Sequence, residues 1–255
     1  MIVEMKIAIL GILQGITEFL PISSSGHLVL FGHFLNFTKD DIVMEVILHF
    51  GTLGSILIFF RKDIVNLLNG IFHRERDSLN YGVYILVATI PIVVFSLSIR
   101  EYIETIFSVN VLIYTYIVNA VILFATRQSV TRKQKISLQL AIIMGCSQVF
   151  ALFPGISRAG ITICTGLLLG HSRKEVAKFS FFMAIPALVG AIVFELDNIM
   201  IYLHQDMSNL IIGLLVSLVT GLFALRLLFK ILQSNKLWVF SYYCIAIWLL
   251  IIYIL

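Results

Sequence analysis

Charged side chains are scarce in this sequence. Asp, Glu, Lys and Arg make up 13% of its 255 residues, whereas an ordinary soluble domain has about 25%. Hydrophobic residues make up 60%, and the mean hydropathy is +1.02. The charges gather in short groups between apolar stretches of about twenty residues, the length at which a helix crosses a hydrocarbon core of roughly 30 Å. The composition therefore excludes a soluble globular domain and predicts an all-α integral membrane protein.

Cysteine is also scarce. Cys146, Cys164 and Cys244 are odd in number, lie within apolar runs, and lack the paired short spacings of zinc sites and disulfide frameworks. We interpret them as small packing residues. The net charge is only +4, and the basic residues form no stripe interleaved with aromatic side chains, which argues against nucleic acid as a partner.

Six apolar stretches are long enough to be transmembrane helices: Ile42–Phe60, Tyr81–Ile99, Phe107–Thr126, Phe179–Phe194, Leu210–Phe229 and Leu237–Leu255. Two further apolar segments, Ile7–Leu35 and Leu138–Gly170, are each broken near the middle by Pro, Gly and Ser residues. Each half of these segments is too short to span a bilayer. Irregular backbone at membrane depth must be surrounded by protein or water, so the two segments predict re-entrant hairpins that line a site.

The two broken segments are related to each other. A shift of 134 positions superposes identical residues: Gly11, Gln14, Phe19, Ile22, Ser23, Gly26 and Gly32 on Gly145, Gln148, Phe153, Ile156, Ser157, Gly160 and Gly166. We therefore expect a first repeat over residues 1–126, a second over 138–255, and a cytoplasmic linker over 127–137. Each repeat has one returning hairpin (7–35 and 138–170) and three spans, so the second must be inverted in the membrane.

The basic residues indicate how these repeats are oriented. Placing the loop after the first span in the cytoplasm puts 14 of the 18 basic residues inside: Arg61, Lys62, Arg74, Arg76, Arg127, Arg132, Lys133, Lys135, Arg173, Lys174, Lys178, Arg226, Lys230 and Lys236. Lys6, Lys39 and Arg100 stay outside, among acidic residues. Both termini and the opening of the site are therefore expected at the outer face.

Four ionisable residues within the apolar segments suggest chemistry: Glu18, His27, Glu45 and Arg158. A charge at the centre of a bilayer costs about 2.5 to 3.5 kcal/mol even on the more lenient scales, so such residues favour a functional interpretation. Gln14 and Glu18 share one helix face, and that face leads into the serines before His27. One polar cluster should result.

Arg158 lies in the second break, between Ser157 and Thr162, where a half-helix begins with its first amides unpaired. A guanidinium, hydroxyls and free amides form an anion site, and a nearby carboxylate would equip it for phosphoryl transfer. The alternatives are a structural ion pair, and packing or capping roles for Ser and Gly. Whether Glu45 and His49 support the site is left open.

Two motifs carry a family resemblance. Residues 14–27 read Gln-Gly-Ile-Thr-Glu-Phe-Leu-Pro-Ile-Ser-Ser-Ser-Gly-His, and residues 154–162 read Pro-Gly-Ile-Ser-Arg-Ala-Gly-Ile-Thr. With these motifs the chain resembles, over essentially its whole length, the membrane undecaprenyl-diphosphate phosphatases associated with bacitracin resistance. The resemblance implies hydrolysis of undecaprenyl diphosphate to the monophosphate carrier lipid of peptidoglycan and cell-envelope synthesis, at the outer face of the bacterial plasma membrane.

The resemblance also implies roles for residues. Glu18, Ser24, His27 and Arg158 match the catalytic positions, and a divalent cation, Mg²⁺ or Ca²⁺, would be held through Glu18 and Gln14. The residues expected to bind substrate are Ser23, Ser25, Gly26, Gly155, Ser157, Gly160 and Thr162. Two positions depart from the family pattern. Gln14 replaces a Glu found in some members, which weakens the metal site, and Ala159 replaces the usual Ser, which removes a hydroxyl.

Two questions stay open at this point. The nucleophile is either Ser24 or a water activated by Glu18, with His27 as acid or base. The rival function is an inverted-repeat transporter or flippase of polyprenyl phosphate lipids, because such repeats are typical of transporters. The chemical difference between the two breaks favours the phosphatase. The expected partners are a polyprenyl diphosphate lipid and the bilayer, and a homodimer is an open alternative.

Overall fold

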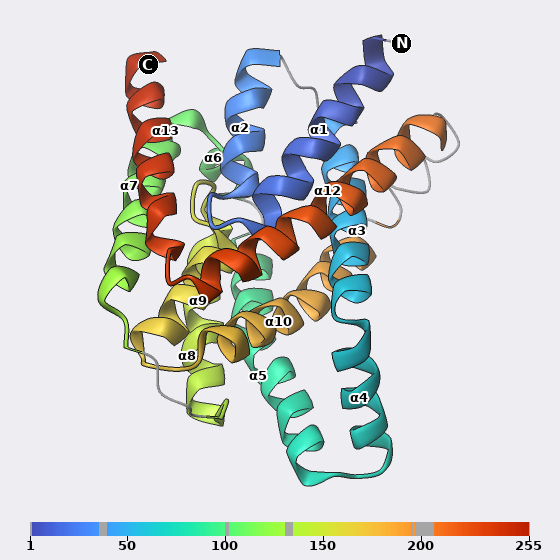
Figure 1. The fold of residues 1–255 in the computed structure, drawn as a ribbon. Coiled ribbons are helices and arrows are strands. Elements are labelled where there is room, and N and C mark those ends of the chain that lie inside the picture. Colours follow the sequence, from blue (N-terminus) through green and yellow to red (C-terminus); the bar gives the residue numbers. More distant parts are fainter. Residues whose placement is uncertain are drawn as a thin grey trace.

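The computed structural model describes residues 2–35, 40–99, 102–130, 135–194, 196 and 207–254, and these residues form no strand. The helices are α1 (Ile2–Phe19), α2 (Ser24–Leu35), α3 (Asp40–Phe59), α4 (Arg61–Phe72), α5 (Arg76–Ser98), α6 (Ile103–Ile106), α7 (Val109–Ala125), α8 (Leu138–Gln148), α9 (Arg158–Leu168), α10 (Arg173–Phe194), α12 (Met207–Gln233) and α13 (Phe240–Ile254). Short 3-10 turns follow as η2 (Thr126–Gln128), η3 (Val149–Leu152) and η4 (Leu237–Val239). The all-α prediction is confirmed (Figure 1).

The first predicted break separates α1 from α2. Pro21 has no backbone N–H to continue the helix, and Ser23 has a φ of +67°, a left-handed conformation that costs a non-glycine residue energy. The hydroxyl of Ser23 then accepts the N–H of Gly26 at 3.2 Å, which caps the start of α2.

The second break, between α8 and α9, follows the same plan. The chain passes through η3 and Pro154, and Gly155 adopts a φ of +96° that suits glycine. Ser157 caps α9 by accepting the N–H of Gly160 at 3.0 Å. Ser157 and Gly160 are the residues that the shift of 134 positions superposes on Ser23 and Gly26, so the two breaks share their capping geometry.

The two breaks meet inside the molecule, and we call residues 18–27 and 152–161 the first and second tips. In Figure 1 the yellow loop before α9 lies beside the blue turn between α1 and α2, and the N–H of Gly155 donates to Ser23 Oγ at 3.0 Å. The backbones approach so closely that a Cβ on Gly26 would lie 2.9 Å from Gly155 Cα. Side chains on either tip can therefore share one site.

Helix packing pairs the two halves of the chain. α1 packs along α12 while α8 packs along α5, and α3 contacts α12 while α10 contacts α5. α7 packs against α13. With the shift of 134 positions, α5 corresponds to α12, α3 to α10 and α7 to α13. The two halves therefore exchange packing partners, as two related repeats would.

Five helices in the described part of the chain are long and apolar enough to cross a membrane: α5, α7 with η2, α10, α12, and η4 with α13. They match five of the six predicted spans. The predicted span Ile42–Phe60 corresponds to α3, whose apolar part is the shorter Val46–Phe59, so six spans stay a prediction. The expected loop after α3 contains α4, an amphipathic helix that the periodicity of its apolar residues could have indicated.

The fold makes the orientation testable, because α1 begins and α13 ends at one end of the molecule while the α4–α5 turn lies at the other (Figure 1). We expect Glu4→Cys to react with a membrane-impermeant maleimide in right-side-out vesicles, and Asp77→Cys to react only after permeabilisation. Both variants need Cys146→Ser, since Cys146 is exposed whereas Cys164 and Cys244 are buried. Labelling of both positions from the same side would contradict the predicted topology.

Candidate active site

The carboxylate of Glu18 is the centre of a buried polar network. Glu18 Oε1 lies 2.7 Å from Arg158 Nη2, and Glu18 Oε2 accepts the Ser24 hydroxyl at 2.7 Å. The side chains of Glu18 and Arg158 are only 7% and 15% exposed. Glu18 lies in the last turn of α1, Ser24 begins α2 and Arg158 begins α9, so three of the four predicted catalytic residues meet across both tips.

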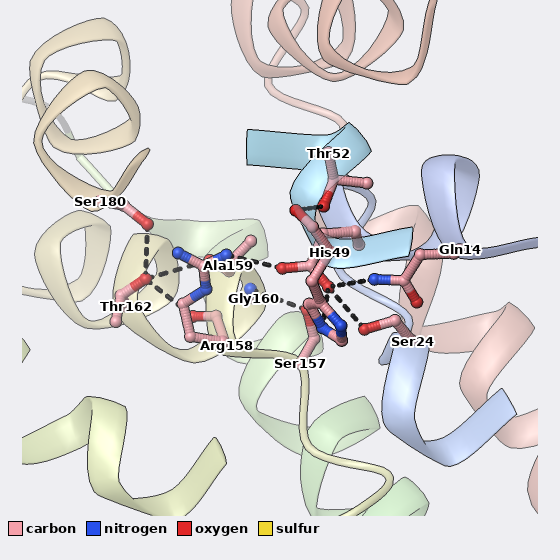
Figure 2. A network of polar contacts seen from close by, with 11 residues as sticks. Gln14, Ser24, His49, Thr52, Ser157, Arg158, Ala159, Gly160, Thr162 and Ser180 are labelled. Carbon is pink, nitrogen blue, oxygen red and sulfur yellow. Dashed lines mark hydrogen bonds and ion pairs between the residues drawn. The ribbon is translucent and has the colours of Figure 1, made fainter. Parts of the chain in front are cut away.

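Neighbouring helices extend this network, which is drawn in Figure 2. Gln14 Nε2 donates to Glu18 Oε2 at 3.2 Å from one turn earlier on α1. His49 of α3, which sequence analysis left open, contributes Nε2 at 3.6 Å from the same oxygen. The side chain of Glu45, the other open candidate, lies outside the described residues.

Thr162 makes a hydrogen bond to the backbone of Arg158. Its hydroxyl donates to the carbonyl of Arg158 at 2.8 Å and lies 2.6 Å from Ser180 Oγ on α10 (Figure 2). Both hydroxyls are buried. In this arrangement Thr162 stabilises the first turn of α9. It therefore acts on the site indirectly, through the position of Arg158.

His27 is held by a different set of groups. Its Nδ1 lies 2.7 Å from the carbonyl of Ser23, and because a carbonyl only accepts, Nδ1 carries the proton. Nε2 of the neutral ring then accepts the hydroxyl of Tyr243 at 2.8 Å, and the Tyr116 hydroxyl lies 3.1 Å from Nδ1. No interaction of the described residues joins His27 directly to Glu18 or Ser24.

The structure pairs some of the amides that were expected to be free at the two breaks. Four of the amides donate to buried side chains: Gly26 and Gly155 to Ser23 Oγ, Ser157 to Asn119 Oδ1, and Gly160 to Ser157 Oγ. The expectation was wrong for these positions because serine and asparagine side chains cap them. Ser25 is half-buried, and its hydroxyl lies 3.3 Å from Ser23 Oγ.

Three residues of this region were missed in the sequence: Tyr116 and Asn119 on α7, and Tyr243 on α13. Asn119 is fully buried and bonds both tips, donating to Pro21 O at 3.0 Å and accepting from Ser157 N at 3.2 Å. The only local signal was a polar amide within an apolar span. Their partners are between 38 and 216 positions away, so spacing could not reveal them.

Fold and site together define a multi-pass, all-helical membrane protein with a buried carboxylate, serine and arginine at two broken helices. The family model for the bacitracin resistance protein BacA matches residues 7–250. The chain is 39% identical to an undecaprenyl-diphosphatase of Thermosipho africanus over 242 residues, 94% of this chain and 95% of the relative. It is 37% identical to an undecaprenyl-diphosphatase of Korarchaeum cryptofilum over 259 residues, 97% of each chain.

Undecaprenyl-diphosphatase 3 of Acinetobacter baylyi is 33% identical over 258 residues, 98% of this chain and 97% of the relative. The chain therefore belongs to the bacitracin resistance protein BacA family.

Substitutions of Glu18 and Arg158 should have strongly non-additive effects on the free energy of unfolding. Breaking a buried ion pair leaves an uncompensated charge and costs about 3 to 5 kcal/mol, so Arg158→Leu should markedly lower the unfolding midpoint in detergent. Adding Glu18→Gln to that variant should restore much of the loss. The exposed pair of Lys135 and Asp77, 2.9 Å apart, is the matched control and should show little or no coupling. Additive effects of Arg158→Leu and Glu18→Gln would contradict the pairing.

Proposed function

We propose that this protein hydrolyses undecaprenyl diphosphate to undecaprenyl phosphate and phosphate. The observation that carries the proposal is the Glu18 carboxylate, which bonds a serine hydroxyl and an arginine at the meeting point of two broken helices. Membership of the BacA family and relatives named undecaprenyl-diphosphatase support the substrate. The product is the carrier lipid of cell-envelope synthesis, and its recycling at the plasma membrane underlies bacitracin resistance.

Arg158 is the group best suited to hold the diphosphate. One nitrogen, Nη2, is paired with Glu18, while Nη1 is buried and has no hydrogen-bond partner among the described residues. A guanidinium can donate to two phosphate oxygens in parallel. It therefore orients the P–O bonds in addition to pairing with the negative charge. The phosphate would compete with Glu18 for this guanidinium, and the carboxylate would then be free to act as a base.

Ser24 and Glu18 are placed for nucleophilic attack. The hydroxyl donates to the carboxylate at 2.7 Å, the geometry in which a base removes the proton as oxygen attacks phosphorus. Attack by Ser24 would break the P–O bond to undecaprenyl phosphate and form a phosphoserine, which water would then hydrolyse to release phosphate. Attack by a water activated by Glu18 would instead leave Ser24 as a binding hydroxyl. His27 is proposed as an acid or base, and Tyr243 would then have to release its Nε2.

A divalent cation, Mg²⁺ or Ca²⁺, fits one side of this site. Gln14 Oε1 is buried and has no hydrogen-bond partner among the described residues, and it stands beside the carboxylate of Glu18. Side chains of His, Cys, Asp and Glu form no group of three or more for a metal within the described part of the chain. The two oxygen donors and the phosphates would hold the ion, which would neutralise charge on the diphosphate.

An apolar groove next to the site suits the polyprenyl chain. It has a volume of about 370 Å³ and lies between α1, α2 and α13, with Ile12, Leu13 and Phe240 among its lining residues. Thr17, the neighbour of Glu18, and Tyr243, the partner of His27, also line it. A lipid in this groove would present its diphosphate at the tips.

The proposed topology has six spans, including α3, and two re-entrant hairpins, with both termini outward in the plasma membrane. The exchange of packing partners between the two halves supports the inverted repeat. Such repeats also occur in transporters, but the flippase alternative is not favoured, because only one tip bears an acid and only the other bears Arg158. The residues proposed for catalysis come from one chain, and a homodimer stays a prediction.

Glu18→Gln and Ser24→Ala test the catalytic assignment. Glu18→Gln keeps size and hydrogen bonding but removes the charge, so phosphate release from undecaprenyl diphosphate by the purified protein should fall about a hundredfold or more. Ser24→Ala should be similarly impaired. Glu75→Gln, a change of an exposed acid at the α4–α5 turn, should leave turnover unchanged. Robust hydrolysis by both site variants would show that Glu18 and Ser24 of the first tip are not catalytic.

Rapid quench of the wild-type reaction separates the two nucleophiles. A serine nucleophile predicts phosphate on the peptide that contains Ser24, and water attack predicts none. Either result keeps the phosphatase, because the two routes differ only in the group that attacks phosphorus.

Arg158→Lys tests the anchor. Lysine keeps the positive charge beside Glu18 but lacks the planar pair of donors, so hydrolysis should be largely lost while the protein still folds. The measurement is turnover together with the unfolding midpoint in detergent. Near wild-type turnover would mean that the guanidinium of Arg158 does not bind the phosphate.

A further inference from the structure

Asn119 of α7 lies between the two tips and is fully buried. Its Nδ2 donates to the carbonyl of Pro21 on the first tip at 3.0 Å, and its Oδ1 accepts the N–H of Ser157 on the second at 3.2 Å. Nδ2 also lies 3.3 Å from Cys244 Sγ on α13. One amide side chain therefore satisfies a backbone acceptor and a backbone donor that the two helix breaks leave without helical partners.

The backbone groups that Asn119 bonds are close in sequence to residues of the proposed active site. Pro21 comes three residues before Ser24, and Ser157 directly precedes Arg158. A shift at either contact would move the hydroxyl and the carboxylate of the first tip relative to the guanidinium of the second.

Two other contacts join the tips, but only one of them can persist during a reaction. The ion pair of Glu18 and Arg158 must loosen when a phosphate engages the guanidinium. The bond from Gly155 N to Ser23 Oγ, at 3.0 Å, and the two bonds of Asn119 involve neither the guanidinium of Arg158 nor the carboxylate of Glu18. These bonds can hold the register of the tips while the ion pair opens.

The same face of α7 contacts both tips at neighbouring positions. Tyr116 places its hydroxyl 3.1 Å from Nδ1 of His27, and Thr115 packs so closely on Gly155 that a Cβ there would collide with its hydroxyl. α7 lies outside both sequence motifs, yet it provides the surface against which the tips are aligned.

We propose that Asn119 is a positioning residue for hydrolysis, which keeps Glu18 and Ser24 in register with Arg158 while the guanidinium binds phosphate. This inference rests on the proposed phosphatase function. Substrate binding would depend mainly on the lipid groove and Arg158, so loss of register should affect the chemical step more than the affinity.

Asn119→Leu removes both bonds at similar volume. We expect kcat for undecaprenyl diphosphate to fall about a hundredfold, the order that a displacement of about 1 Å can cause, with KM within about threefold of wild type. Asn110→Leu changes the same residue type at an exposed position of α7, and Thr220→Val removes a hydroxyl bond between α12 and α1 of 3.2 Å. Both controls should keep wild-type kcat.

Asn119→Asp gives a second, reversible test. A protonated aspartic acid has one donor and one acceptor in the places of the amide, whereas the carboxylate faces the Pro21 carbonyl without a donor. The ratio of its kcat to that of wild type should therefore rise at least tenfold as the pH is lowered from about 8 to about 5, a range chosen for a buried carboxyl. The ratios for Asn119→Leu and Asn110→Asp should not change with pH.

The outcomes separate the two proposals. If the wild-type protein releases no phosphate from undecaprenyl diphosphate, the proposed function fails. If the wild-type protein hydrolyses the lipid and Asn119→Leu has a kcat within about threefold of it, the positioning role is wrong. A pH-independent ratio for Asn119→Asp, or an equal loss of kcat in Thr220→Val, would also overturn it, since either indicates a general effect on packing.

Discussion

The ion pair between Glu18 and Arg158 is the interaction on which the rest of the site depends. Two charges lie at the meeting point of two helix breaks, where desolvation is costly and neither charge is tolerable alone. The pair can form only if both breaks occur at the right residue and if both tips reach the same place. The prolines, the serine caps and the contact of Ser23 with Gly155 are the local features that meet these conditions.

The shift of 134 positions relates the two breaks, but the breaks differ at the residues that form the polar network. Ser24 and Arg158 occupy equivalent positions, each directly after a capping serine, and each bonds a different oxygen of the Glu18 carboxylate. The position equivalent to Glu18 in the second half is Leu152, which has no charge. One scaffold thus presents a hydroxyl and a guanidinium to a single acid. A transporter that alternates between equal halves has no evident need for this difference.

The sequence predicted the parts of the fold and site that have local causes. Proline and serine at the breaks and a carboxylate in an apolar helix are signals within a few residues, and the structure brings Glu18, Ser24 and Arg158 together as expected. Features with distant causes were missed. Asn119 acts on groups 98 and 38 positions away, and His27 turns toward Tyr243, 216 positions away. The amide of Ser157 was expected to be free because its partner, Asn119, comes from another helix.

The network combines contacts that must open with contacts that must stay closed. In the structure Arg158 is occupied by Glu18, so a phosphate can bind it fully only by displacing the carboxylate, and that displacement leaves the carboxylate next to the hydroxyl of Ser24. In the proposed reaction, phosphate binding and the release of this carboxylate as a base are then one event. Such an exchange keeps its geometry only if the backbone around it is held independently of the charges. Ser23, Thr162 and Asn119 do this with neutral hydrogen bonds, to which a diphosphate offers no electrostatic competition.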